Sequence, residues 1–235
     1  MSPTVADVKF VDRRVKRMPE KRKYELKQRA EQMRETRRRI TEATVELHRT
    51  VGPAATQVTE IARRAGVQRV TVYNHFPDDA SLLSACSAHW RALHPAPDPS
   101  TWLAATDAGE RLRLGLRELY AWYRRTEPMT ANILRDAQTI PALRAIVERG
   151  LGSYLDVVQC VLKEPIRARG RRRHRVDTAV GVAVDFHVWR ALATLGDHEA
   201  AGLAAGLVEL AAAAPPRTRA SGSRAVKRAS ARTGA

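Results

Sequence analysis

The chain has 235 residues, of which 44% are hydrophobic and 5% aromatic, so it can bury one sizeable core or two modest ones. Its 41 Lys and Arg residues outnumber its 25 Asp and Glu residues, and the formal net charge of +16 favours a polyanionic partner, either nucleic acid or an acidic membrane surface. The sequence shows no apolar run near the ~18 residues of a membrane span and no secretory signal, so we expect a cytoplasmic protein without a membrane partner. Abundant Ala, Leu and Arg, with no alternating strand pattern, predict an all-α fold.

The two ends of the sequence are much more basic than its middle. The formal charge is +8 over residues 1–39 and +6 over residues 215–235, against +2 over residues 40–214. Residues 1–34 lack a core-forming apolar stripe and predict a basic N-terminal arm with a solvated helical extension. Residues 214–235 predict a basic disordered tail, and the sequence leaves two readings open: a contribution to DNA affinity, or no more than solvated surface.

The first core helix is predicted over residues 35–50, where apolar residues recur at helical spacing on one stripe. The dipeptide Gly52-Pro53 ends this helix. The stripe consists of Ile40, Ala43, Leu47 and Val51. We expect this helix to open a domain over residues 35–93.

Residues 56–76, TQVTEIARRAGVQRVTVYNHF, predict two short helices joined by a tight turn. Thr56 is a suitable N-cap, and Gly66 stands where a left-handed backbone suits glycine because glycine has no Cβ. The apolar stripe of the first helix is Val58, Ile61, Ala62 and Ala65. The segment therefore predicts a helix-turn-helix, and the alternative is an ordinary helical hairpin with a polar outer face.

The second helix of this motif separates inward apolar residues from outward polar ones. The inward positions are Val67, either Val70 or Thr71, and the pair Val72 and Phe76. The outward residues are Gln68, Arg69, Tyr73, Asn74 and His75. These side chains supply donors and acceptors that suit base edges and phosphates, and the face lacks the Glu and Lys typical of a solvated helix.

A fourth helix is predicted after the break at Pro77-Asp78, with Asp79 in its first turn. Its expected buried side is Leu82, Leu83, Cys86, Trp90 and Leu93. The proline-rich segment 94–100 is typical of a linker, and a helical regulatory and dimerisation domain is expected over residues 101–213. Its predicted helices are 101–106, 108–126, 128–138, 140–163, 175–195 and 197–213, with a loop at 167–175.

The C-terminal region holds most of the aromatic residues of a protein that is otherwise poor in them. Such residues usually form core, but a ligand pocket between bundle helices is lined by the same kind of side chain together with a few polar groups. The candidate pocket residues are Trp90, Trp102, Tyr120, Tyr123, Met129 and His187. We expect the effector to be small and mostly apolar.

No catalytic constellation is visible in the sequence. His89 and His94 are five residues apart and do not share a helical face, and no carboxylate or cysteine completes a metal-ligand set. Phosphate-binding loops and nucleophile motifs are missing as well. We therefore expect no enzyme activity, no metal and no cofactor, and we expect Cys86 and Cys160 to be small buried hydrophobes.

The order of these elements and the amino-acid sequences of two segments resemble the tetracycline-repressor (TetR) family of bacterial transcriptional regulators. The segments RRRITEATVELH and VTEIARRAGVQRVTVYNHFPDDASLL are similar to that family's DNA-binding domain over residues 36–93. The resemblance implies an N-terminal helix-turn-helix domain of three helices. It also implies a C-terminal helical bundle that binds an inducer and forms a homodimer.

The resemblance further implies roles for single residues of the motif and its lead-in. The expected base contacts are Thr59, Arg69, Val70 and Asn74. The expected phosphate contacts are Arg38, Arg39, Gln57, Gln68, Thr71, Tyr73 and His75. The sequence departs from the family at Gln68, where Ser or Thr is frequent, and at Asp79, where Lys is common. Asp79 replaces a phosphate contact with a repulsive charge, for which the basic arm is a candidate compensation.

These patterns predict a sequence-specific DNA-binding transcriptional regulator, a ligand-responsive repressor that binds a near-palindromic operator as a homodimer. The alternative is a low-specificity architectural DNA-binding protein driven by its basic arms. Dimerisation is expected through the last two helices, where the segment AAGLAAGLVELAAAA offers small residues for close helix approach. The other residues expected on that surface are Val180, Val184, His187, Val188 and Ala191.

Overall fold

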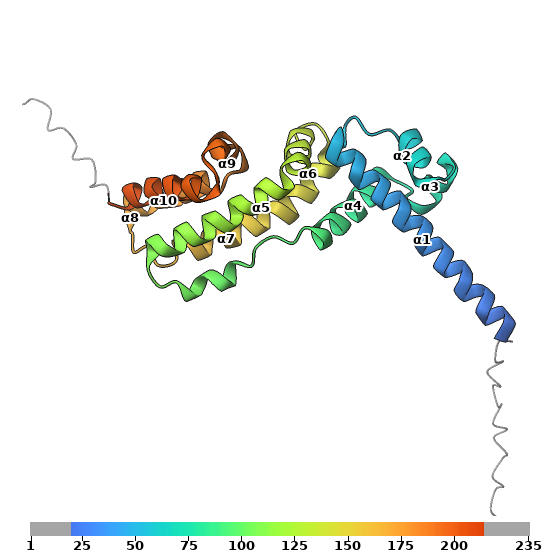
Figure 1. Cartoon of the computed structure of the whole chain (residues 1–235), viewed down its shortest axis with the longest axis horizontal. Coiled ribbons are helices and arrows are strands. Elements are labelled where there is room, and N and C mark those ends of the chain that lie inside the picture. Colours follow the sequence, from blue (N-terminus) through green and yellow to red (C-terminus); the bar gives the residue numbers. More distant parts are fainter. Residues whose placement is uncertain (1–19, 214–235) are drawn as a thin grey trace, which may run out of the picture. The chain divides into compact units, whose positions relative to one another are not determined.

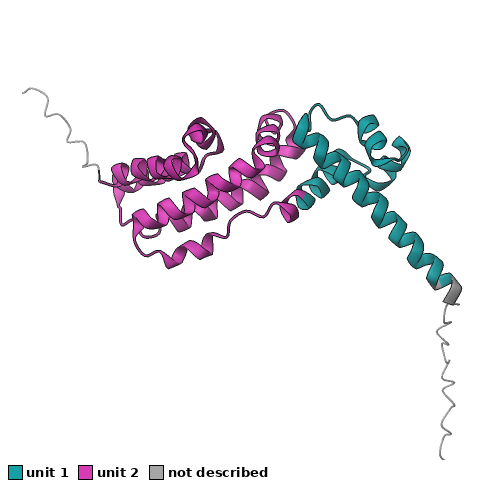
Figure 2. Cartoon of the chain, viewed as in Figure 1, with its two compact units in different colours: residues 1–89 teal, residues 90–235 magenta. Residues whose placement is uncertain are grey.

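The computed structural model describes residues 20–213, and these residues are helical with no strand among them (Figure 1). The arm residues 1–19 and the tail predicted over 214–235 lie outside the described residues. The chain divides into two compact units, residues 1–89 and residues 90–235 (Figure 2). No described helix combines the length and the apolar character that a membrane crossing requires.

A single long helix, α1 (Glu20–Thr50), joins the predicted extension and the predicted first core helix without a break (Figure 1). Its C-terminal part is buried at Ile40 and Leu47, whereas Leu26 and Met33 are 50% and 62% exposed because no described element covers this stretch. The predicted apolar stripe ends at Leu47, since Val51 follows the helix and is exposed.

Three further helices complete the first unit: α2 (Val58–Ala65), α3 (Arg69–His75) and the start of α4 (Asp79–Leu93). Their shared core with α1 contains Ile40, Leu47, Ile61, Ala62, Ala65, Val72, Phe76, Leu82, Leu83 and Cys86. Burial raises the pKa of the Cys86 thiol to about 12, so this cysteine is the small buried hydrophobe that the sequence predicts.

The turn between α2 and α3 has the geometry that the sequence predicts. Gly66 has φ +63°, and its N–H donates to the carbonyl of Arg63. The predicted N-cap is wrong by one residue, because Gln57 precedes α2 while Thr56 Oγ1 donates to the carbonyl of Gly52 at 2.8 Å.

Helix α4 begins with a cap from Asp78, whose Oδ1 accepts the Ser81 N–H at 2.7 Å. The predicted buried side of α4 fails at its last turn, where Trp90 is half-buried and Leu93 is 60% exposed. The boundary between the two units falls inside α4, ahead of the proline-rich segment 94–100.

The second unit is built around its longest helix, α5, which contacts α6, α7, α8, α9, α10 and η1 (Figure 1). Its elements are η1 (Pro99–Ala104), α5 (Ala108–Asp136), α6 (Pro141–Val147), η2 (Glu148–Gly152), α7 (Ser153–Lys163), α8 (Gly170–Val184), α9 (Phe186–Leu192), η3 (Ala193–Leu195) and α10 (Asp197–Ala213). At Gly115 of α5 a Cβ would lie 2.6 Å from Leu162 Cδ2 and 2.9 Å from Trp102 Cε3, so glycine permits the close approach of these three segments.

The helix predicted over residues 140–163 is observed from Pro141 to Lys163, with the π-helical turn η2 inside it. Three other predictions about the second unit are wrong. Helix α5 continues through Pro128, which is exposed, so the predicted break after residue 126 does not occur. The predicted helix 175–195 is interrupted at Asp185, whose carboxylate caps α9 by accepting two backbone N–H groups. Residues 167–175 are not all loop, because α8 already begins at Gly170.

Two expectations about burial in the second unit also change. Cys160 is exposed on α7 and is not a core residue. Val180 and Val184 are fully buried in their own protomer's core, so they cannot form a surface for a second copy.

Candidate nucleic-acid interface

Helix α3 presents the polar face that the sequence predicts. Val72 and Phe76 are buried, with 1% and 2% of their surfaces exposed, and they fix the helix on the unit's core. Val70 is 57% exposed and Tyr73 is 44% exposed, so Val70 belongs to the outer face and Thr71 is the half-buried member of that pair. The structure brings the expected base-contacting residues of α3 together, since Arg69, Val70 and Asn74 are all exposed on it.

Arg69 and Tyr73 contact each other on this face. Arg69 Nη2 donates to the Tyr73 hydroxyl at 3.0 Å, and the guanidinium lies 5.5 Å from the Tyr73 ring centroid. The contact joins residues one helical turn apart on the exposed face of α3, so it fixes neither side chain strongly.

Arg37 of α1 holds the C-terminal end of α3, a contact that the sequence did not reveal. Its Nη1 donates to the carbonyl of His75, and its guanidinium lies 3.9 Å from the Phe76 ring centroid. The carbonyl at the end of a helix is an orphan acceptor and carries partial negative charge, so a cation satisfies it well. Arg37 therefore ties the C-terminal end of α3 to α1.

The arginines expected to meet phosphates on α1 differ in their surroundings. Arg38 donates to Glu35 at 2.7 Å and to Glu42 at 2.6 Å, and these carboxylates raise its pKa. Arg39 lies beside the turn, with Nη1 3.7 Å from the position of a Cβ on Gly66. Because Arg38 is neutralised by two neighbours, Arg39 is the better placed of the two to meet a phosphate.

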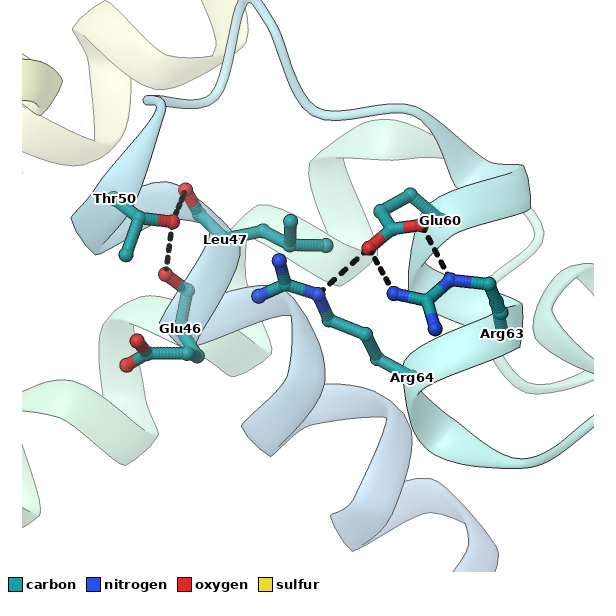
Figure 3. Close-up of polar contacts among 6 residues, drawn as sticks. All are labelled: Glu46, Leu47, Thr50, Glu60, Arg63 and Arg64. Carbon is teal, nitrogen blue, oxygen red and sulfur yellow. Dashed lines mark hydrogen bonds and ion pairs between the residues drawn. The ribbon is translucent and has the colours of Figure 1, made fainter.

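Helix α2 carries an ion-pair cluster on its exposed side (Figure 3). Glu60 accepts two hydrogen bonds from Arg63, at 2.8 and 2.7 Å, and one from Arg64 at 2.8 Å. The hydrogen bonds from Arg63 and then Arg64 lower the pKa of Glu60 to about 2. The single negative charge of Glu60 thus offsets one of the two arginine charges on α2.

The remaining motif residues lie at the start of α2 and around α3. Gln57 and Thr59 are exposed, and Thr59 Oγ1 lies 3.5 Å from Gln57 Oε1. Gln68 precedes α3 and makes no side-chain capping bond, in line with its departure from the Ser or Thr of the family. His75 is half-buried, and Asp79 is exposed at the start of α4.

The candidate pocket residues of the second unit do not form one group. Trp102, Tyr120 and Tyr123 are fully buried in the hydrophobic core, and Met129 is buried on α5. His187 is exposed and Trp90 is half-buried. The hydroxyls of Tyr120 and Tyr123 each donate a 2.7 Å hydrogen bond, to the carbonyls of Ala183 and Val184.

Comparison with known proteins finds a family similarity within the first unit. Residues 40–86 match the family described as bacterial regulatory proteins, tetR family. A search of curated proteins gave no match. One solved structure, described as RolR in complex with the ligand resorcinol, is 19% identical with a TM-score of 0.45, and the match covers 79% of this chain and 97% of that one. A TetR transcriptional regulator from Rhodococcus sp. RHA1 is 20% identical with a TM-score of 0.38, covering 77% of this chain and 97% of that one.

Both TM-scores lie below 0.5, so these two structures determine neither the arrangement nor the ligand of the second unit. The family match runs from Ile40 in α1 to Cys86 in α4 and contains the whole helix-turn-helix. It confirms the resemblance carried by the motif and excludes an ordinary helical hairpin. Residues 40–86, which contain the helix-turn-helix, are thus similar to the bacterial regulatory proteins of the tetR family.

Proposed function

We propose that the protein is a sequence-specific repressor that binds a near-palindromic operator as a homodimer and responds to a small, mostly apolar effector. The observation that carries the proposal is α3, a short helix held on a buried core with Arg69, Val70 and Asn74 exposed together. A helix of this length reads a few base pairs, and two copies would read two half-sites one DNA turn apart. We infer that it acts in the cytoplasm.

The chemistry of the exposed residues suggests how bases are read. Arginine recognises guanine through two hydrogen bonds, asparagine recognises adenine in the same way, and an apolar side chain such as Val70 suits the thymine methyl group. Arg69 must leave the Tyr73 hydroxyl to reach a base edge. The hydroxyl only accepts from Arg69, so its own proton can be donated to a phosphate. We therefore assign base readout to Arg69, Val70 and Asn74, with Thr59 beside them, and phosphate contacts to Arg39, Gln57 and Tyr73.

An exposed apolar stripe on α10 supports the homodimer. Leu203, Leu207 and Leu210 are 47%, 54% and 67% exposed, and they recur at helical spacing. Positions Gly202 and Gly206 have no heavy atom within 4 Å of a built Cβ, so the helix surface beside the leucines is open. Pairing of α10 with the same helix of a second copy is isologous and would bury this stripe at small residues that permit close approach.

The aromatic side chains of the second unit support an effector site. Tyr123 and Phe186 have their ring centroids 5.4 Å apart in a T-shaped arrangement, and Met129 follows Tyr123 along α5. Aromatic and thioether side chains of this kind make favourable walls for an apolar ligand. Trp102 has its indole N–H bonded to Glu118 at 2.8 Å, so we assign it to the core and not to the effector site.

Selection of bound sequences from random duplex DNA by the full-length protein tests the proposal. We expect an enriched site with two inverted half-sites whose centres are about 10 base pairs apart. Sedimentation should show a dimer at micromolar concentration, and Leu207→Glu should give monomers. The matched change Val157→Glu, at a position of α7 that is 51% exposed, should not. Enrichment of no sequence would refute the regulator, and a wild-type monomer would refute the dimer.

A low-specificity architectural protein is the second candidate, and the charge distribution favours it. Residues 1–39 carry +8, and α1 exposes its described side chains before Arg34. Removing residues 1–30 and 215–235 should reduce the slope of log affinity against log salt by about 0.9 for each phosphate that the truncated protein no longer neutralises. If the protein is a regulator, the truncated form keeps its preference for the selected site over a scrambled duplex. Loss of nearly all binding together with that preference would favour the architectural function.

A further inference from the structure

The indole N–H of Trp189 lacks a hydrogen-bond partner. Of the buried side-chain nitrogen and oxygen atoms within residues 20–213, Trp189 Nε1 is the one that makes no hydrogen bond, and the whole side chain is 0% exposed. Buried polar groups in native proteins are nearly always paired, because an unpaired donor loses its hydration without compensation. The exception therefore indicates a place where an acceptor belongs.

The surroundings of Trp189 contain aromatic faces. The centroid of its ring lies 5.5 Å from that of Tyr123 and 5.4 Å from that of Phe186. The hydroxyl of Tyr123 already donates to the carbonyl of Val184 and points its polar end at α8. These rings offer stacking surfaces but no acceptor for the indole.

The same face of α5 continues from Tyr123 to buried polar residues. Thr126 and Thr130 are 0% and 3% exposed, and Met129 beside them is 4% exposed. Thr130 Oγ1 donates to Thr126 Oγ1 at 3.3 Å, and Thr126 Oγ1 donates to the carbonyl of Trp122 at 2.9 Å. Apolar walls with a few fixed polar groups are the usual composition of a small-molecule site.

Helix α9, which carries Trp189, is a short segment fastened to α5 at its surface. It begins at the cap Asp185, and the following turn ends at Gly196 with φ +78°. Two ion pairs join this segment and the start of α10 to α5: Arg190 with Glu127 at 3.1 Å and Arg124 with Asp197 at 2.9 Å. Both pairs are partly exposed, and such pairs are weak, so α9 is held on α5 mainly by its buried aromatic residues Phe186 and Trp189.

We propose that Trp189 Nε1 donates the orienting hydrogen bond to the effector, an uncharged aromatic molecule with an oxygen acceptor that binds between α5 and α9. The acceptor pairs the indole N–H, and the ring of the molecule stacks against Tyr123 and Phe186. An uncharged molecule fits because the two cations beside Trp189 already have carboxylate partners: Arg124, 5.9 Å from its ring centroid, pairs with Asp197, and Arg190 pairs with Glu127. Any effect of the molecule on DNA binding rests on the proposed function, whereas binding of the molecule at Trp189 does not.

The experiment compares two probes of nearly equal size, acetophenone and ethylbenzene, of which only acetophenone carries an acceptor. The chain has 4 tryptophans, so 15N-labelled full-length protein gives one indole signal for each, assigned with single Trp→Phe variants. We expect acetophenone to bind about tenfold more tightly than ethylbenzene and to move the Trp189 indole proton downfield. In Trp189→Phe the two affinities should become nearly equal.

Trp122→Phe is the matched control, because the Trp122 indole already donates to the carbonyl of His94 at 3.2 Å. This variant should keep the preference for acetophenone. If near-ultraviolet circular dichroism shows that Trp189→Phe has lost its tertiary structure, this variant is set aside. The ratio of the two wild-type affinities and the shift of the Trp189 indole proton then test the proposal.

Equal affinities of the wild type for both probes, absence of acetophenone binding, or an unchanged ratio in a folded Trp189→Phe would each overturn the inference. Failure of this inference is distinct from failure of the proposed function. A protein that selects an operator but ignores acetophenone contradicts the effector site alone. One that binds acetophenone through Trp189 but selects no DNA sequence contradicts the regulator alone.

Discussion

The two units satisfy their polar groups over very different distances along the chain. In the first unit many of the bonds are local: Gly66 bonds back to Arg63, and Glu60 pairs with Arg63 and Arg64 one turn away. In the second unit Tyr120 reaches Ala183 across 63 positions, and Arg111 reaches Glu164 across 53. The first unit is therefore specified mainly by short segments, and the second by contacts between distant ones.

This difference accounts for the surfaces that each unit leaves available. Local bonds complete the backbone of α2 and α3 and leave the outer side chains of α3 exposed to meet a ligand as large as DNA. Long-range hydrogen bonds in the second unit pair the polar groups of buried aromatic residues such as Tyr120 and Tyr123. Trp189 Nε1 differs from these groups because it has no hydrogen-bond partner. Substitutions in either unit can test this contrast, and we expect the largest loss of stability where a buried long-range contact is removed.

Arg111→Ala should destabilise the second unit by about 3 kcal/mol, because it removes a buried guanidinium that serves several acceptors. Arg111 is 4% exposed and donates to Glu164 at 2.6 Å and to the carbonyl of Ala105 at 2.8 Å. All 4 tryptophans lie in residues 90–235, so urea unfolding followed by tryptophan fluorescence reports on this unit.

Arg113→Ala is the control for Arg111→Ala. Its ion pair with Glu209 joins side chains that are 52% and 42% exposed, and exposed pairs contribute about 0–1 kcal/mol. Equal losses in the two variants would contradict the idea that long-range buried contacts hold the second unit.

The same contrast decides how much could be predicted from the sequence. The stripe through Ile61 and Ala65 and the glycine at Gly66 act within a few residues, so the helix-turn-helix and its outer face were predicted correctly. The continuation of α5 through Pro128 was missed, because packing overrides a local helix-breaking signal when the proline faces solvent. Asp185 was missed as a break, since a capping carboxylate inside an apolar run has no strong periodic signal.

Some site residues were beyond prediction for the same physical reason. The contact of Arg37 with His75 spans 38 positions, and no local pattern marks it. Cys160 was expected to be buried because it lies in an amphipathic helix, but burial depends on which neighbours cover that face. In both cases the missing information is which distant segments meet.

Arg69→Ala should weaken binding to the selected operator by about 1–3 kcal/mol and relax the preference at one base pair. Tyr73→Phe should weaken operator and scrambled duplexes alike, because the hydroxyl is assigned to a phosphate and a phosphate contact carries no sequence information. Titration of both duplexes with both variants measures this. If Arg69→Ala, like Tyr73→Phe, lost the same affinity on both duplexes, the assignment of Arg69 to base readout would be wrong.

Gly66→Ala should destabilise the first unit by about 1 kcal/mol, because alanine is strained at φ +63°. A Cβ there would be 3.7 Å from Arg39 Nη1, an ordinary contact, so the strain lies in the backbone. Gly181→Ala inside α8 should instead stabilise the second unit by about 0.5–1 kcal/mol, since its Cβ would lie 3.6 Å from Gln159 Oε1. Amide hydrogen exchange should show that Gly66→Ala lowers the unfolding free energy of the first unit and that Gly181→Ala raises that of the second unit. Changes of the same sign would contradict the assignment of strain to the turn.

The weakest dependence expected is that of stability on the protonation of the Glu60 cluster. The hydrogen bonds from Arg63 and Arg64 hold the pKa of Glu60 at about 2, below its ordinary value of 4.5. A carboxylate with a lowered pKa in the folded state stabilises the protein above pH 4.5, and that contribution is lost as the pH falls from 4.5 toward 2. Glu60→Gln should therefore be slightly less stable than the wild type at neutral pH, and the gap should close on acidification.

Titration of the Glu60 side-chain carbon by nuclear magnetic resonance tests the cause directly. Arg63 donates two hydrogen bonds to Glu60 and Arg64 donates one, so Arg63→Gln should raise the pKa of Glu60 more than Arg64→Gln. Arg64 also interacts electrostatically with Glu46 on α1, whose pKa is lowered mainly by Arg49, and Arg64→Gln should raise the pKa of Glu46 slightly. A Glu60 that titrates near 4.5 in the wild type would show that these local ion pairs do not persist in solution, and Arg63 and Arg64 would then be available to phosphates beside the recognition helix.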